Sequence, residues 1–181
     1  KGLEAAKRGD FATALLEWRP LAEQGHAKAQ YNLGVMYDFG RGVSKDYKQA
    51  VYWYKKAAEQ GIAEEQYNLG VMYDFGKGVA EDDTQAVYWY RKAAEQGNVQ
   101  AQYNLGVMYR NGQGVTEDDT QAVYWYRKAA EQGHALAQIN LGLMYNFGGG
   151  VAKDDTQAFY WFRKAAEQGH ADAQIILGFR Y

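Results

Sequence analysis

The chain has 181 residues, 47% hydrophobic and 15% aromatic, so it can bury a core and does not have the composition of a disordered protein. Lysine and arginine number 20 against 22 acidic residues, which gives no general attraction to nucleic acid or anionic membrane. No apolar run approaches the roughly 20 residues needed to cross a bilayer, and the lack of cysteine excludes disulfides, thiolate zinc sites and cysteine nucleophiles.

A 36-residue repeat organises the chain, because the tripeptide EQG returns at that interval from Glu23 to Glu167. The last unit stops in mid-pattern at Tyr181, so we expect the natural protein to continue. The pattern predicts a single repeat domain over residues 1–181. It consists of a divergent N-terminal hairpin at 1–25, full repeats at 26–61, 62–97, 98–133 and 134–169, and a truncated repeat at 170–181.

Each unit predicts two helices. In the first full unit, apolar residues at steps of three and four predict a helix near 27–38, which ends at Gly40. A second helix is expected to begin at Asp46, an N-cap residue, and to end at Gly61. One helix pair cannot bury its apolar face alone, so the pairs must stack into a continuous all-α core. The same helix start recurs at Asp82, Asp118 and Asp154.

The motif A-x-AQ-x-x-LG-x-x-Y, then G-x-GV, then D-x-x-x-A-x-x-W-Y-x-x-A-A, occupies residues 22–57 and recurs along the chain. It resembles the Sel-one-like repeat (SLR) family, a branch of the tetratricopeptide superfamily. The resemblance implies a right-handed α/α superhelical solenoid of stacked antiparallel helix pairs, whose first helices line a concave groove. It also implies a non-enzymatic scaffold or adaptor for protein partners. The opening residues look like mature exported bacterial members, which favours a periplasmic or secreted location.

Departures from the repeat are few. Glu65 replaces the small residue found at Ala29, which puts close packing at that joint in doubt. Residues 1–25 lack the G-x-GV loop and join their helices directly at Gly9 and Asp10. The N-terminal unit therefore looks more like an ordinary tetratricopeptide hairpin or a cap.

The side of the first helix opposite Leu33 is the candidate partner-binding face, because its charges vary between units while the buried columns stay uniform. Its tyrosines and valines either anchor a protein or peptide partner or pack between adjacent first helices. Its asparagines either grip a peptide backbone or tie down a neighbouring segment. The candidate residues are Lys28, Tyr31, Asn32, Val35, Asp38, Phe39, Glu64, Tyr67, Asn68, Asp74, Gln100, Tyr103, Asn104, Arg110, Asn140 and Asn146.

A second surface follows the outer side of the second helices, where a tyrosine precedes a lysine by four residues, as in Tyr52 and Lys56. This spacing predicts cation–π contacts. An aromatic and basic stripe can also touch nucleic acid, but Glu59 and its equivalents interrupt it. We therefore expect no nucleic-acid partner.

Catalytic and metal sites have weaker support. His26, His134 and His170 share one repeat position, where a helix-start or linker role fits better than catalysis or metal binding. A β-lactam-binding or hydrolysing enzyme, suggested for some cysteine-rich relatives, needs a nucleophile beside a base, and Ser44 is the only serine. A purely structural assembly module is the third alternative. We expect a monomer without cofactor or metal.

Overall fold

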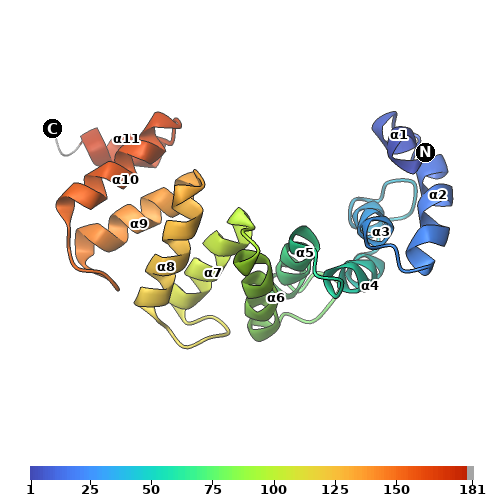
Figure 1. The fold of residues 1–181 in the computed structure, drawn as a ribbon, viewed down its shortest axis with the longest axis horizontal. Helices are drawn as coiled ribbons and strands as arrows, with labels where there is room; N and C mark the ends of the chain where they lie inside the picture. Colours follow the sequence, from blue (N-terminus) through green and yellow to red (C-terminus); the bar gives the residue numbers. More distant parts are fainter. Residues whose placement is uncertain (179–181) are drawn as a thin grey trace. The chain divides into compact units, whose positions relative to one another are not determined.

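The computed structural model describes residues 1–178, which form helices joined by turns and short loops (Figure 1). No strand occurs in this part of the chain, and the all-helical prediction is confirmed. Tyr181, which the sequence places in the same column as Tyr37, lies outside the described residues. The helices are α1 Gly2–Lys7, α2 Phe11–Glu23, α3 Ala27–Phe39, α4 Tyr47–Ala58, α5 Ala63–Asp74, α6 Asp83–Glu95, α7 Val99–Asn111, α8 Asp119–Glu131, α9 Ala135–Phe147, α10 Asp155–Glu167 and α11 Ala171–Gly178.

The chain divides into two compact units, one over residues 1–93 and the other over 94–181. In the first unit α2 packs against α3, α3 against α4, and α4 against α5. In the second unit the same succession joins α7, α8, α9 and α10. The expected stacking of consecutive helix pairs is therefore confirmed within each unit.

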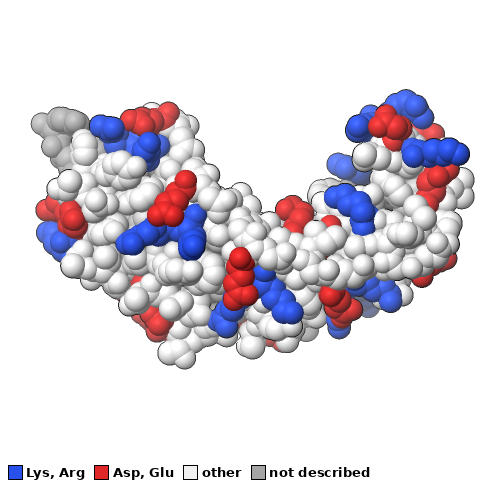
Figure 2. Space-filling model, viewed as in Figure 1, with Lys and Arg blue, Asp and Glu red and all other residues white. Residues whose placement is uncertain are grey.

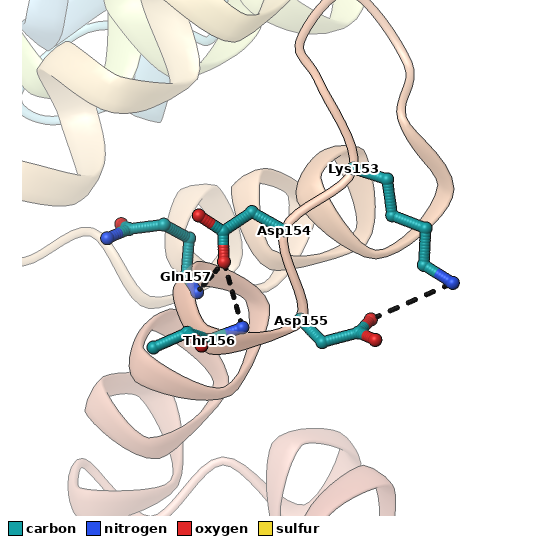
Figure 3. A network of polar contacts seen from close by, with 5 residues as sticks. All are labelled: Lys153, Asp154, Asp155, Thr156 and Gln157. Carbon is teal, nitrogen blue, oxygen red and sulfur yellow. Dashed lines mark hydrogen bonds and ion pairs between the residues drawn. The ribbon is translucent and has the colours of Figure 1, made fainter.

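Aspartate side chains start the second helices of the repeats. The Asp154 carboxylate accepts hydrogen bonds from the backbone N–H groups of Thr156 at 2.9 Å and Gln157 at 3.0 Å (Figure 3). These bonds satisfy two of the donors that have no partner within the helix. The N–H of Asp154 in turn donates to the Tyr145 carbonyl at 2.9 Å, which ties the loop to the first helix of the hairpin. The same contacts recur at Asp46 and Asp118.

Glycines end several first helices and let the following loop approach its neighbour. Gly40 caps α3 in the left-handed conformation, with φ 66° and ψ 36°, and its N–H donates to the Met36 carbonyl. The predicted end of this helix is therefore confirmed. Gly42 has φ 70°, and a Cβ added there would lie 2.8 Å from Cβ of Phe11 in the preceding hairpin. A larger residue at Gly42 would push this loop away from α2.

Each hairpin core is built around one glycine and one aromatic ring. A Cβ added to Gly34 of α3 would lie 2.5 Å from the Tyr54 ring of α4, so glycine permits the close approach of the two helices. Tyr54 is 2% exposed and Leu33 is fully buried. Trp53 clusters with Ala22 and Leu33, which joins its hairpin to the preceding one. The glycine–ring contact recurs at Gly106 with Tyr126 and at Gly142 with Phe162.

Buried glutamines, here called the glutamine ladder, form hydrogen bonds between consecutive hairpins. The repeat pattern by itself does not predict these bonds. Gln30 of α3 donates to the Ala22 carbonyl of α2 at 3.0 Å and accepts from the Gln60 side chain at 2.7 Å. Each such amide satisfies a carbonyl at the end of the preceding second helix, where helical partners run out. The other members of this glutamine ladder are Gln66, Gln102 and Gln138, which donate to Ala58, Ala94 and Ala130.

Candidate partner-binding face

The candidate residues of the first helices, from Lys28 to Asn146, are here called the first-helix face. None of them is buried, so all can be reached from solvent to some degree. Five are exposed and the others are half-buried. The exposed ones are Lys28, Phe39, Glu64, Gln100 and Arg110.

The tyrosine column is partly core and partly surface. The Tyr31 ring lies 5.9 Å from the Tyr54 ring, centroid to centroid, and the same contact recurs between Tyr103 and Tyr126 at 6.1 Å. Tyr31 and Val35 also pack against the apolar cluster that contains Leu69 of the next hairpin. Burial raises the pKa of Tyr31 and Tyr103. The packing alternative raised by the sequence therefore describes part of what these side chains do.

The asparagine column reaches back to the tyrosine of the preceding repeat. The Asn68 side chain lies close enough to Tyr31 to influence its pKa, and Asn140 lies similarly close to Tyr103. Both contacts oppose the rise that burial causes in the tyrosine pKa. These pairs lie between neighbouring hairpins. Both roles of the asparagines, gripping a peptide backbone and tying down a neighbouring segment, stay predictions.

Two acidic residues of the face close the hairpin cores. The Tyr54 hydroxyl donates to the Asp38 carboxylate at 3.5 Å, and the Tyr90 hydroxyl donates to Asp74 at 2.8 Å. Burial raises the pKa of Asp74, while the hydrogen bond from Tyr90 opposes that rise. In the third full repeat Arg110 takes this position and donates to the Met144 sulfur. The variation in this column therefore includes internal contacts as well as surface charge.

The charge at the first exposed position changes along the chain. In the first unit it is positive at Lys28, whose ammonium lies 4.8 Å from the centre of the Tyr31 ring, and negative at Glu64. In the second unit it is the neutral Gln100, whose amide oxygen lies 3.1 Å from Nε2 of His134. The same helical position thus offers a different charge in each of these three repeats.

His134 starts α9. Its Nδ1 accepts the N–H of Ala137 at 3.2 Å, and its ring stacks on Tyr103 with 4.6 Å between centroids. Burial lowers the pKa of His134, and the nearby His170 lowers it further. An Nδ1 that accepts a hydrogen bond requires an unprotonated nitrogen, which agrees with this direction. The predicted role at a helix start is therefore confirmed for His134.

Two hollows adjoin the first-helix face in the N-terminal hairpins. The first, about 340 Å³, is lined by Leu3, Trp18, Leu21, His26, Lys28, Ala29 and Asn32. The second, about 160 Å³, is lined by Ala6, Phe11, Trp18, Tyr31, Asn32, Val35, Met36 and Arg41. They share Trp18 and Asn32, so they are neighbours. Four residues of the face, Lys28, Tyr31, Asn32 and Val35, line them, whereas Trp18 was not among the predicted residues.

The outer surface of the second helices carries the predicted cation–π contacts. The Lys56 ammonium lies 5.1 Å from the Tyr52 ring centre, and Lys128 lies 5.6 Å from Tyr124. Hollows of about 420 and 450 Å³ lie beside Trp125 and Trp161 on this side. Positive and negative side chains alternate over the displayed surface instead of gathering into one patch (Figure 2).

The described part of the chain has neither a cluster of metal-ligating side chains nor a membrane-spanning helix. Within residues 1–178, no group of three or more histidine or acidic side chains is placed to hold a metal ion. None of the helices described is long and apolar enough to span a bilayer.

Known proteins share both the repeat and the fold. The Sel1 repeat family model matches residues 27–62, 66–98, 99–134 and 135–170. A solved Sel1 repeat protein from Oxalobacter formigenes is 39% identical, with a TM-score of 0.92 over 97% of this chain and 72% of that one. The protective antigen c5321 of uropathogenic Escherichia coli, which has an SLR fold, is 45% identical, with a TM-score of 0.91 over 93% of this chain.

The chain is much shorter than some of these relatives. It covers 36% of the antigen. Its match to the rat DAP3-binding cell death enhancer 1, 40% identical, extends over 50 residues, which are 28% of this chain and 10% of that protein. The four matched repeats and the Oxalobacter structure nevertheless agree over most of the sequence. The chain belongs to the Sel1 repeat family.

Proposed function

We propose that the chain is a protein-binding scaffold that holds a segment of its partner against the first-helix face. Sel1 repeats are generally modules for protein–protein interaction, which supports the broad function. The name of the rat relative says that it binds another protein, DAP3. The choice of face rests on the distribution of charge along the helices.

The observation that carries the choice of face is the exposed position occupied by Lys28, Glu64 and Gln100. The packing positions beside it are nearly uniform, because Leu33, Leu69, Leu105 and Leu141 are all fully buried. The exposed position instead changes from positive to negative to neutral. Within the first unit, a partner segment that crosses two repeats meets a positive and then a negative charge. Such complementarity distinguishes one partner from another.

The test is affinity capture of a partner by the purified chain, followed by a titration of that partner against charge-reversed variants. Lys28→Glu and Glu64→Lys in the first unit, and Arg110→Glu in the second, are each expected to weaken binding by about tenfold. Lys56→Glu, on the outer side of α4, is the matched control and should leave the affinity within about twofold. The choice of face is wrong if the control weakens binding and the three reversals do not.

Catalysis has no support from the surroundings of the single serine. Ser44 is exposed in the loop between α3 and α4, and no hydrogen bond joins it to a described histidine or lysine. A serine nucleophile needs such a base within reach. Incubation of the purified chain with nitrocefin should therefore give no turnover, and turnover that Ser44→Ala abolishes would overturn this assignment.

A further inference from the structure

Two hollows with the same lining lie on the outer side of the second helices in the second unit, and they are here called the outer hollows. One, of about 420 Å³, is beside Trp125 of α8, and the other, of about 450 Å³, is beside Trp161 of α10. Each is lined by a tyrosine, a tryptophan, a lysine, two glutamates and two glutamines at equivalent repeat positions. Glu131 lines both. The chain therefore presents the same pocket twice, one repeat apart, with one acid in common.

The charges around the outer hollows favour a positive ligand. Glu95 and Glu131 line the first hollow, and Glu131 and Glu167 line the second, against a single lysine in each. The C-terminal ends of α6 and α8 also line the first hollow, and those of α8 and α10 line the second. Helix C-termini carry partial negative charge, which attracts cations. Neither Glu95 nor Glu131 forms an ion pair within the described part of the chain, so both carboxylates can receive one.

The tyrosines of the outer hollows already attract cations. The Lys128 ammonium lies 5.6 Å from the centre of the Tyr124 ring, and Lys164 lies 5.8 Å from that of Tyr160. Tyr124 is 48% exposed and Tyr160 is 43% exposed, so each ring also offers surface to a ligand. Arginine suits such a place better than lysine, because its planar guanidinium stacks on aromatic rings and binds a carboxylate through two N–H groups.

Each outer hollow also contains a hydrogen-bond donor without a partner. The indole N–H groups of Trp125 and Trp161 are buried and have no acceptor among the described residues. Each indole meets the ring of the tyrosine before it edge to face, with 4.8 and 4.9 Å between centroids. A peptide backbone brings carbonyl acceptors, which a free polyamine lacks. The unpartnered N–H groups therefore favour a protein segment over a small cation.

We propose that the outer hollows receive two arginine side chains from one extended basic segment of a protein. The site has no residue in common with the first-helix face, so it is a second interaction surface beyond the proposed function. Each guanidinium pairs with the glutamates, Glu131 among them, and stacks on the exposed ring of Tyr124 or Tyr160. As that ring turns toward the guanidinium, the indole N–H beside it becomes accessible to a carbonyl of the segment. Because the pocket is repeated, the first arginine raises the effective concentration of the second.

The probe is a fluorescein-labelled peptide with two arginines in a glycine–serine chain, titrated with the whole protein chain and followed by fluorescence anisotropy. The number of residues between the arginines is varied from about 3 to 12. Saturable binding is expected, strongest at one spacing, because only a segment of matched length reaches both hollows. Replacing one arginine with citrulline, its neutral isostere, should weaken binding by about tenfold. Equal affinity of the arginine and citrulline peptides, or the same affinity at every spacing, would overturn the proposal.

Two matched pairs of variants locate the binding. Glu131→Gln removes an acid from both hollows and should weaken binding by about tenfold, whereas Glu117→Gln, in the loop before α8, should change it by less than about twofold. Lys128→Gln removes the cation that lies over the Tyr124 ring and should strengthen binding by about threefold. Lys153→Gln, in the loop before α10, makes the same charge change and should stay within about twofold. The proposal fails if both members of either pair behave alike while circular dichroism shows each variant folded.

Other occupants of the outer hollows give different results. Spermidine, a cation without a carbonyl acceptor, should not displace the peptide even at about a hundredfold excess, and displacement would overturn the proposal in favour of a polyamine site. If a second copy of the chain fills the hollows, sedimentation will show dimers that Glu131→Gln dissociates, and the proposal is wrong. If no peptide binds but the captured partner still depends on Glu64 and Arg110, this inference fails and the proposed function stands.

Discussion

At the scale of single residues, Glu65 carries an unfavourable burial. Its side chain is fully buried, and neither carboxyl oxygen has a hydrogen-bond partner. The close packing of α5 at this position is therefore kept, although an acid replaces the alanine found in the other repeats. The equivalent residues Ala29, Ala101 and Ala137 are alanines in similarly buried places, so the fold does not need an acid there. A buried carboxyl group without partners is destabilising because folding removes its water.

Glu65→Ala is expected to raise the free energy of unfolding at neutral pH by about 1–3 kcal/mol, the usual desolvation cost of an unsatisfied group. Urea unfolding followed by circular dichroism measures this change. Glu64→Ala, on the exposed neighbour, is the control and should stay within about 0.5 kcal/mol. A loss of stability in Glu65→Ala would show that the carboxylate has a partner.

The same residue makes stability depend on pH. Burial raises the pKa of Glu65, and the positive charge of Lys28 opposes that rise without cancelling it. Between the unfolded pKa and the raised folded pKa, the folded chain holds more protons, so its stability falls as pH rises through this window. Above the folded pKa, the chain has lost all of the stability that depends on the protonation of Glu65. Unfolding at a series of pH values from about 4 to 7 should show this decline, and Glu65→Ala should remove that part of it.

At the scale of the helix, two adjacent aspartates at the start of α10 distinguish the effect of an N-cap hydrogen bond from the effect of negative charge alone. Asp154 binds two backbone N–H groups of α10, whereas its neighbour Asp155 only approaches Lys153 at 3.9 Å between exposed groups (Figure 3). Asp154→Ala should lower the free energy of unfolding by about 1 kcal/mol, the typical value of an N-cap. Asp155→Ala should change it by less than about 0.5 kcal/mol. Equal effects in thermal unfolding would mean that charge alone matters.

In the middle of a first helix, glycine should stabilise the chain more than alanine does, which is contrary to the usual helix propensities. Alanine normally stabilises a helix by about 1 kcal/mol over glycine. At Gly106, however, a Cβ would lie 2.7 Å from the Tyr126 ring of α8. Gly106→Ala should therefore destabilise the chain by about 1–3 kcal/mol. In the double variant with Tyr126→Leu, part of this loss should be recovered, and additive effects in chemical unfolding would contradict the packing explanation.

Sequence predicted the helices well because their limits depend on nearby residues. The first helix was expected near 27–38 and spans Ala27–Phe39, and the cap at Asp46 lies where its residue type indicated. Contacts between helices were harder to predict. The bond from Tyr54 to Asp38 crosses a hairpin, and the partner of Gln30 lies in a different one. A helical period identifies which side of a helix is buried, but it does not identify the atoms that it meets.

The candidate face could also be predicted only in part from the sequence. Its exposed charges, such as Lys28, could be found because they vary among repeats that are otherwise alike. The hollow beside the face could not be predicted, because residues of α1, α2 and α3 line it together, and the sequence does not show which of their side chains meet. One signal was present in the sequence: the first unit has a tryptophan where the next three have Tyr54, Tyr90 and Tyr126.

At the scale of the whole molecule, stability in a repeat protein is a sum of the repeats and of the joints between neighbours. The glutamine ladder belongs to the joints. In the second unit, Gln138 of α9 donates to the Ala130 carbonyl of α8 at 3.1 Å and accepts from Gln168 at 2.8 Å. Its side chain is only 3% exposed, so water cannot replace these partners fully when the side chain is removed.

Gln138→Ala should therefore weaken one joint while leaving the helices of both repeats intact. We expect a loss of about 2–4 kcal/mol, because a buried carbonyl and a partly buried amide lose their partner together. Weaker coupling should also make unfolding less cooperative, with a smaller dependence on urea concentration at the midpoint. Gln121→Ala, at a half-buried position of α8, should do neither. A variant that loses stability but keeps the full urea dependence would show that the apolar contacts of the joint, including Trp161, couple the repeats without the ladder.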